Sequence, residues 1–281
     1  MVKTRKLLRF IFVPAAMLAM AGCAHFQHQE TEHFKLFYEP RSPAEKDIEA
    51  LKAHVEKIHH SLNGDNYMPS RKVSYYFHNK YPLHFFGSPV LGYVWNGNIH
   101  AVYTENVKEI TSHELMHLYL HKMNPEAPFF FEEGTCNIGN YYVRQYAVQG
   151  QHFTQIITSH DLIARQKSLP SLKKVIKGFS LLTYGYESWF TPPLPRYEIA
   201  RSFCQFLYAT HGQKYWIFYE QVRPGNFESK MEEVFGKKFV ATESEWKAFL
   251  GDVKAQNGYE VINELLDNLP APLESKSKHN D

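Results

Sequence analysis

One pair of histidines constrains this chain more than any other feature. His113 and His117 are four residues apart. On a helix they lie one turn apart on the same face, so both imidazoles can reach a single metal ion, usually zinc. Glu114 directly follows the first histidine and is placed to act on a water molecule at that ion rather than to bind the ion. Because the chain contains 16 histidines, the pattern could arise by chance, and it becomes strong only with a third ligand.

The segment after the histidine pair supplies this third ligand. The Asn-Pro pair at 124–125 is expected to stop the first helix, and a second helix is expected over residues 131–144. Two helices joined by so short a loop pack antiparallel, which returns the start of the second helix to the side of the first. Glu132 and Glu133 stand there, and either can deliver a carboxylate to the metal. Two His, one Glu and an open fourth position are typical of catalytic zinc sites, whereas structural sites are closed.

These residues resemble a known family. The His-Glu-x-x-His motif is separated by fifteen residues from the second Glu of a Phe-Glu-Glu-Gly segment. The arrangement is similar to the gluzincin zinc metallopeptidases, the clan of thermolysin and aminopeptidase N, and most of all to the small bacterial peptidase MA-like domains. In those families the Glu before the Gly is the third ligand. The resemblance therefore implies one zinc ion per chain, bound by His113, His117 and Glu133. It leaves Glu132 as the competing ligand and makes Glu114 the general base.

Comparison with other branches of zinc peptidases refines these assignments. The aminopeptidase branch carries an upstream Gly-x-Met-Glu-Asn motif that grips the amino terminus of the substrate, and nothing in this chain matches it. An astacin-like third histidine would fall on Met123, so His121 is expected to be a neighbour of the site rather than a ligand. One turn beyond its glutamate ligand, thermolysin has an Asp that accepts the N–H of a ligating imidazole. Asn137 takes that place here.

A later segment adds to the resemblance. Aminopeptidase-type gluzincins carry a Tyr-Glu pair at the start of a helix, and the Tyr donates a hydrogen bond to the oxyanion of the transition state. The pair Tyr197-Glu198 matches it, so the resemblance gives Tyr197 this catalytic role. The alternative is that Tyr197 only packs against its neighbours, because the chain contains 18 tyrosines.

The first 22 residues are predicted to be an export signal. Four basic residues precede an apolar run over 10–21, and small residues stand before Cys23. The pattern resembles a bacterial lipoprotein signal, in which Cys23 becomes the lipidated first residue of the mature chain. The alternatives are an ordinary secretory signal or an N-terminal anchor, although the run is short for a spanning helix of about 20 residues. Since Ala24 is not the Asp that favours inner-membrane retention, we expect a lipid anchor in the outer membrane, facing the periplasm.

Two further cysteines, Cys136 and Cys204, stand on predicted helices. Export would permit a disulfide between them, but buried, unpaired thiols are the expected state. The net charge of +2 gives no reason to expect nucleic acid as a partner, and no cluster of basic and aromatic residues follows the first ten residues.

The expected fold class is α+β, in a single metallopeptidase domain. Short apolar strands, a long helix over 42–62 and an Asn-Gly hairpin turn at 96–97 predict a small sheet with one helix. The rest is predicted to be mostly helical, and 44% hydrophobic residues can supply a sizeable core. The expected boundaries are 1–22 for the signal, 33–104 for the α/β part and 105–270 for the helical part of the domain 23–270, and 271–281 for a loose tail.

Two segments are candidates for substrate contact. In gluzincins the strand before the motif helix is the sheet edge that an extended peptide joins, and the resemblance places this edge at 99–103. Ordinary pairing inside the sheet is the equally open alternative. The aromatic and Pro-rich segment 178–195 is a possible pocket wall, with core packing as its alternative.

The predicted function is zinc-dependent hydrolysis of peptide bonds in the bacterial cell envelope, with a peptide or protein as substrate. One alternative is a non-catalytic zinc-binding lipoprotein that serves as a peptide-binding or assembly module. Glu114 argues against it, because a purely structural site has no need of an unligated acid. The other alternative is zinc-dependent hydrolysis of peptidoglycan amides by the same residues.

Overall fold

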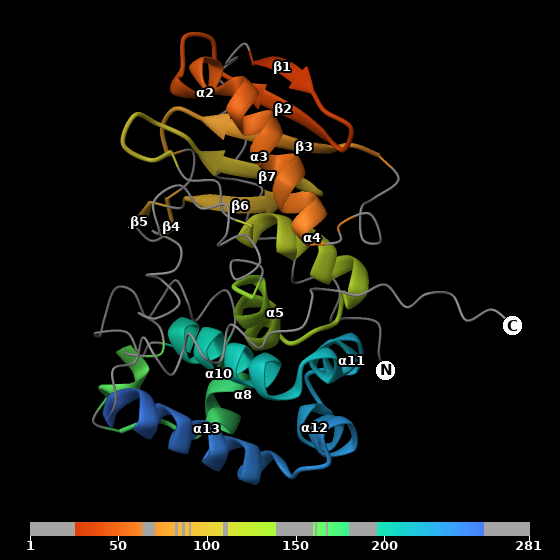
Figure 1. Ribbon diagram of the computed structural model, residues 1–281, viewed down its shortest axis with the longest axis vertical. Helices are drawn as coiled ribbons and strands as arrows, with labels where there is room; N and C mark the ends of the chain where they lie inside the picture. Colours follow the sequence, from red (N-terminus) through yellow and green to blue (C-terminus); the bar gives the residue numbers. More distant parts are fainter. Residues whose placement is uncertain are drawn as a thin grey trace, which may run out of the picture.

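The computed structural model describes residues 26–62, 64, 71–81, 84–85, 88–89, 91–108, 112–138, 160, 162–166, 168–179 and 196–255. The predicted signal with Cys23, most of the aromatic segment and the tail lie outside these ranges. Within them, a five-stranded sheet comes first and a mostly helical part follows (Figure 1). This arrangement confirms the predicted α+β class. No helix in the described ranges has both the length and the apolar character needed to cross a membrane.

The sheet has the strand order β1-β2-β3-β7-β6. Its three inner strands are parallel, and the two outer strands, β1 and β6, pair antiparallel with their neighbours. The strand bounds are β1 Gln27–Glu30, β2 Phe34–Tyr38, β3 Val73–His78, β6 Gly92–Trp95 and β7 Asn98–Val102, with the separate short pair β4 His84–Phe85 and β5 Ser88–Pro89. The sequence pattern did not predict β1, which is polar throughout.

The strand order decides between the two alternatives for the segment 99–103. The segment lies mostly in β7, which is paired on both sides, with β3 and with β6, so ordinary pairing inside the sheet is confirmed and the edge position is not. The predicted hairpin explains this result. Asn96 and Gly97 adopt positive φ values of 50° and 72°, as a tight hairpin turn requires, so that β6 folds back alongside β7. The edge strand on this side is therefore β6, and it contacts the helix that carries the histidine pair.

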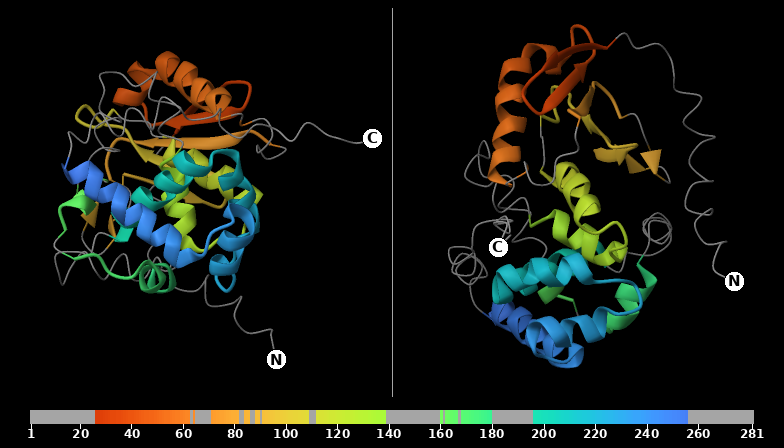
Figure 2. Two further views of the ribbon diagram at one scale, coloured as in Figure 1. Left: turned by 60° about the horizontal axis from the view of Figure 1, so that its bottom comes forward. Right: turned by 90° about the vertical axis from the view of Figure 1, so that its right-hand side faces the viewer.

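One long helix covers one face of the sheet, as the right-hand view of Figure 2 shows. The predicted helix is divided at Asp47 into α2 (Pro43–Lys46) and α3 (Ile48–Ser61). Ser42 caps α2, because its hydroxyl accepts a hydrogen bond from the Glu45 N–H at 3.3 Å. The apolar face of α3 packs into one core with the sheet residues that alternate toward it. The helix contributes Ile48, Leu51, Val55 and Ile58, and the sheet contributes Phe34, Leu36, Val73, Tyr75, Phe77 and Ile99.

The other face of the sheet carries a row of rings, called here the aromatic row. It consists of one ring from each strand in spatial order: His28, Phe37, Tyr76, His100 and Tyr93. Successive residues of this row are direct partners in the register of adjacent strands. Their neighbouring ring centroids lie between 4.6 and 5.3 Å apart. Three of the four contacts are stacked. Such cross-strand pairs stabilise a sheet by about 0.2–1 kcal/mol each.

The helical part packs around α5 and α10, which make extensive contact with each other. Helices α4 and α5 lie between the sheet and the remaining helices (Figure 1). The helix bounds are α4 His113–Met123, α5 Phe129–Cys136, α8 Leu172–Gly178, α10 Arg196–His211, α11 Gln213–Gln221, α12 Phe227–Phe235 and α13 Phe239–Ala255. Helix α5 begins two residues before the predicted helix over 131–144 and ends at Cys136, and the predicted continuation over 139–144 lies outside the described ranges.

Close packing of α5 on α10 depends on one glycine. A Cβ atom at Gly134 would lie closer than 3.0 Å to the backbone oxygen of Ala200 and to Sγ of Cys204. The two helices can approach this closely only because Gly134 has no side chain. Cys136 and Cys204 are both buried and unpaired, as expected from the sequence.

Candidate metal centre

The histidine pair lies in the first half of α4. The helix buries Leu115, Met116, Tyr119 and Leu120 in the core, and its histidines lie on a face that is only partly covered. The rings of His113 and His117 are 4.8 Å apart between centroids and nearly perpendicular, at 82°. Their Nε2 atoms approach each other to 3.2 Å. The spacing of four residues therefore brings two nitrogen atoms to one point in space.

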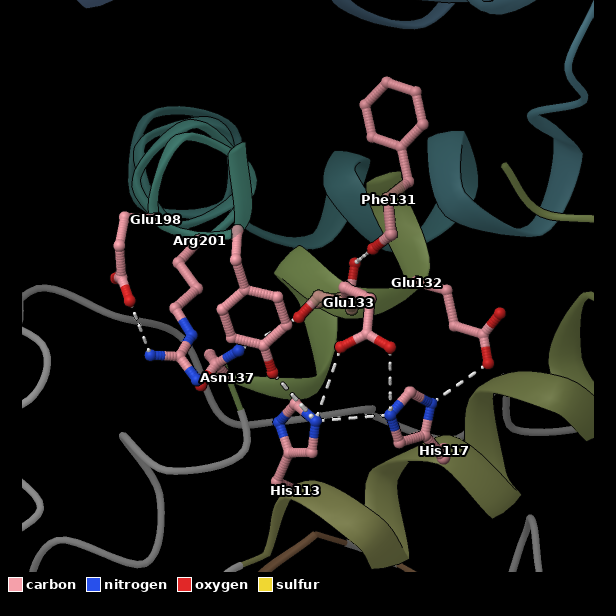
Figure 3. Close-up of polar contacts among 10 residues, drawn as sticks. His113, His117, Phe131, Glu132, Glu133, Asn137, Glu198 and Arg201 are labelled. Atoms are coloured by element: carbon pink, nitrogen blue, oxygen red, sulfur yellow. Dashed lines mark hydrogen bonds and ion pairs between the residues drawn. The ribbon is translucent and has the colours of Figure 1, made fainter. Parts of the chain in front are cut away.

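Glu133 of α5 completes a cluster of three donor groups (Figure 3). Its Oε2 lies 3.5 Å from Nε2 of His113, and its Oε1 lies 3.6 Å from Nε2 of His117. A tetrahedral zinc ion bonded at about 2.0–2.1 Å holds its ligand atoms about 3.3 Å apart. The two nitrogen atoms, 3.2 Å apart, match this separation, and the Glu133 carboxylate places one oxygen at 3.5 Å from His113 and the other at 3.6 Å from His117, within reach of the same ion. The donor set of two imidazoles and one carboxylate fits zinc in chemistry as well as in spacing.

Glu132, the competing ligand in the sequence, has a different position. It turns to the other side of the His117 ring, where its Oε1 lies 3.0 Å from Nδ1 (Figure 3). A carboxylate that accepts the Nδ1–H leaves the lone pair of Nε2 for an ion. Asn137, expected in this role, instead donates its amide N–H to the backbone oxygen of Glu133 at 3.0 Å. Successive helical residues point about 100° apart, which separates the directions of the two glutamates.

Glu114 follows His113 on α4, and its carboxylate is not one of the three converging donors. Its side chain rests against the first residue of the edge strand β6, because a Cβ at Gly92 would come within 2.9 Å of Glu114 Cγ and Oε1. The side chain of Glu114 is half-buried. An acid that is next to a ligand on the same helix but does not join the donor set is suited to proton transfer.

Tyr197 reaches the same place from α10. Its Oη lies 3.1 Å from Nε2 of His113. The guanidinium of Arg201 lies over the Tyr197 ring, 4.0 Å from its centroid, and also binds the Glu198 carboxylate at 3.2 Å. Arg201 is thus in contact with both residues of the Tyr-Glu pair and fixes the ring from behind. The structure thus brings His113, His117, Glu133 and Tyr197 together from three different helices, with Glu114 next to His113 on α4.

Charges in the cluster are strongly coupled. Burial raises the pKa of Glu133, but the imidazoles of His117 and His113 and the hydroxyl of Tyr197 lower it more, to about 2. For His117 the effect of burial has the opposite sign and lowers the pKa. Its neighbours Cys136, Glu133 and Glu132 outweigh burial and raise this pKa well above its ordinary value. Burial and the Glu133 charge raise the pKa of Tyr197, so its hydroxyl remains a hydrogen-bond donor at neutral pH. The site therefore holds a fixed negative charge on Glu133, as a cation requires.

Cys136 also lies at this site, although the sequence predicted it only as a buried thiol. Its Sγ and a ring nitrogen from each of His113 and His117 all lie within 4.8 Å of one another. Cys136 is three residues beyond Glu133 on α5, and this spacing puts both on one side of the helix. The spacing was the available signal, although it is weak without knowledge of where α5 packs.

Comparison with known proteins adds little to this geometry. No protein-family model and no curated protein matches the chain. Among solved structures, the chain is similar to an aminopeptidase N family protein from Idiomarina loihiensis, with 12% sequence identity and a TM-score of 0.38. The match covers 89% of this chain and 47% of the other, so the chain spans about half the length of that protein. So distant a likeness carries no argument about activity.

Proposed function

We propose that this chain is a zinc-dependent hydrolase of peptide bonds that acts in the bacterial cell envelope, anchored through a lipid on Cys23. The observation that carries the proposal is a set of three converging donors, with an acid outside the set directly after the first of them on the same helix. His113, His117 and Glu133 lie at the mutual distances of zinc ligands, and Glu114 keeps its carboxylate out of the set.

Each residue of the site has a role in this reaction. A bound zinc ion supplies a Lewis acid and lowers the pKa of a water molecule toward about 7. Glu114 accepts a proton from the attacking water and delivers it to the leaving amine. The Tyr197 hydroxyl donates a hydrogen bond to the carbonyl oxygen as negative charge develops there. Glu132 fixes the tautomer and orientation of the His117 ring.

The edge strand β6 is the proposed docking place for an extended substrate. Among the described residues β6 pairs only with β7, so we infer that its outer N–H and C=O groups can pair with a peptide backbone. Because Gly92 of this strand touches Glu114, a peptide paired with β6 passes close to the proposed general base.

The role of Tyr197 is tested by replacing it with Phe. Loss of one hydrogen-bond donor to a developing oxyanion lowers kcat by about 10²–10³-fold. Zinc content and KM are expected to stay near those of the unchanged protein, because the ring and its packing against Arg201 remain. Tyr76→Phe, on the far face of the sheet, is the matched control and should keep full activity. An unchanged kcat in Tyr197→Phe would remove the residue from the catalytic set.

The zinc dependence is tested by His117→Ala. Removal of one of three ligands should leave this site without zinc, measured by elemental analysis after dialysis, and should abolish cleavage of an unfolded protein substrate. His121→Ala, an exposed histidine on the same helix, is the control and should retain both zinc and activity. A chelator should inactivate the unchanged protein and added Zn²⁺ should restore it. Purified peptidoglycan assayed in parallel distinguishes amide hydrolysis in the cell wall from proteolysis.

The position of Cys136 favours one second candidate, a closed structural zinc site. If its thiolate were a fourth ligand, no position would remain for a substrate. Cobalt substitution distinguishes the two, because a Co²⁺–thiolate bond has a strong charge-transfer absorption in the near ultraviolet. The hydrolase proposal predicts that this band is absent and that Cys136→Ala keeps its zinc and its activity. A Co²⁺–thiolate band that Cys136→Ala removes would support the structural site.

A further inference from the structure

A second cluster of potential metal-binding side chains lies toward the C-terminal end of α3. Glu56 and His60 are four residues apart on this helix, and His33 comes just before β2. One ligand atom from each of the three residues lies within 4.8 Å of the other two. The spacing within α3 repeats the arrangement of the histidine pair on α4, with a carboxylate in place of one imidazole. None of the three residues belongs to the proposed hydrolytic site.

The distances in this cluster fit a single ion. Oε2 of Glu56 lies 2.7 Å from Nδ1 of His33 and 4.0 Å from Nε2 of His60. These values lie on either side of the separation of about 3.3 Å between ligands of a tetrahedral zinc ion, so small side-chain rotations reach it. The rings of His33 and His60 are 5.6 Å apart and perpendicular, at 89°. The ring pair at the first site has similar values, 4.8 Å and 82°.

Two of the three side chains are already held in place. The backbone N–H of His33 donates to Oε1 of Glu56 at 2.9 Å, which leaves Oε2 to face the histidines. The His33 ring packs against the ring of His59, with 4.1 Å between centroids. The side chains of His33 and Glu56 are 17% and 18% exposed, whereas His60 is 58% exposed. The cluster thus has two oriented ligands and one on the solvent side, where an ion can enter.

The cluster also stands next to the helix of the first site. His59 packs against the His33 ring, and its Nδ1 lies 2.7 Å from the hydroxyl oxygen of Tyr119 on α4. Gly64 packs directly against this hydrogen-bonded pair, because a Cβ atom at Gly64 would lie closer than 3.0 Å to both His59 and Tyr119. The C-terminal end of α3 accordingly reaches α4 (Figure 1). An ion held at this point would link the start of β2 to α3, next to the place where α3 meets α4.

We propose that His33, Glu56 and His60 form a second, separate binding site for a divalent transition-metal ion, with zinc as its expected occupant. Two imidazoles and one carboxylate are the donor set that zinc and its neighbours prefer, whereas Ca²⁺ and Mg²⁺ take oxygen ligands. The site is structural, and its occupation stabilises the junction of β2, α3 and α4. The alternative is an ordinary hydrogen-bonded pair of His33 and Glu56 that binds no ion.

The test counts zinc ions on the full chain. Metal-free protein is equilibrated with Zn²⁺ alone, and bound zinc is measured by elemental analysis after dialysis against a metal buffer. Two ions per chain are expected in the unchanged protein. His60→Ala and Glu56→Gln should each lose one ion, and His117→Ala should lose the other. His60 is largely exposed, so its replacement leaves the core intact, and circular dichroism checks this. His121→Ala is the matched control and should bind two ions.

A second measurement separates ion binding at this cluster from the first site. In His117→Ala, a hundred-fold excess of Zn²⁺ over Kd should raise Tm by about 5 °C or more. The rise should vanish in the double variant with His60→Ala. The proposal is overturned if His60→Ala and Glu56→Gln both bind as much zinc as the unchanged protein. It is equally overturned if His117→Ala binds none. Neither result depends on hydrolytic activity, so the two proposals succeed or fail separately.

Discussion

Glu114→Gln should retain the zinc of the unchanged protein and lose hydrolysis by about 10²–10⁴-fold. The amide has nearly the shape of the carboxylate, so the contact with Gly92 and the helix start of α4 stay as they are. It cannot accept a proton at neutral pH, and the attacking water then has no base. Because Glu114 lies outside the three-donor cluster, removing its charge leaves the ligands of the ion unchanged.

The measurement is kcat on an unfolded protein substrate, with bound zinc determined on the same samples. Glu232→Gln on α12, an exposed glutamate far along the chain, is the control for the chemical change itself. Full turnover in Glu114→Gln would exclude the proposed mechanism. Loss of zinc together with turnover would instead identify Glu114 as a ligand, and the assignment of an open site would fail.

Gly134→Ala should destabilise the protein by about 3 kcal/mol or more, because the added methyl group has no space. It would lie closer than 3.0 Å to the backbone of Ala200 and to the Cys204 thiol, so α5 and α10 have to move apart. This movement carries Glu133 on α5 away from Tyr197 on α10, and it disturbs the site as well as the core. We expect Tm to fall by about 6 °C or more, with reduced zinc affinity.

Gly251→Ala is a close control for this substitution. Gly251 also lies within a helix, α13, but nothing stands within 4 Å of a Cβ placed there. Replacing glycine with alanine in an open helical position stabilises by about 1 kcal/mol, so the two variants should differ in sign. If thermal unfolding showed equal effects for both, the close approach of α5 and α10 would not be the reason for a glycine at 134.

Local spacing predicted the parts of the molecule that depend on one helix at a time. The pair His113 and His117 lies on one face of α4, and the Ser-Pro start of α2 and the Asn-Gly turn before β7 occur where the sequence indicates them. These features follow from helical periodicity, capping and φ preferences, which act over a few residues. The buried face of α3 was predictable for the same reason.

Features that depend on contacts between distant segments were not predictable in this way. Whether Glu132 or Glu133 faces the Nε2 atoms of the two histidines depends on how α5 is rotated about its axis. The packing of α5 on α10 through Gly134 decides that rotation. The inner position of β7 follows from its pairing with β3, more than twenty residues earlier in the chain. Cys136 joins the site only once α5 is placed beside α4.

The aromatic row has a consequence for the opposite face of the sheet. Tyr93 of β6 stacks on His100 of β7 at 4.7 Å, and this contact holds only while the two residues stand opposite each other. A slip of β6 by one residue would turn Tyr93 to the other face and bring a bulky side chain to the place of Gly92. Glu114 would then lose the gap in which it rests. The aromatic row, on the face of the sheet away from the site, thus fixes the register that keeps Gly92 opposite Glu114, the proposed general base.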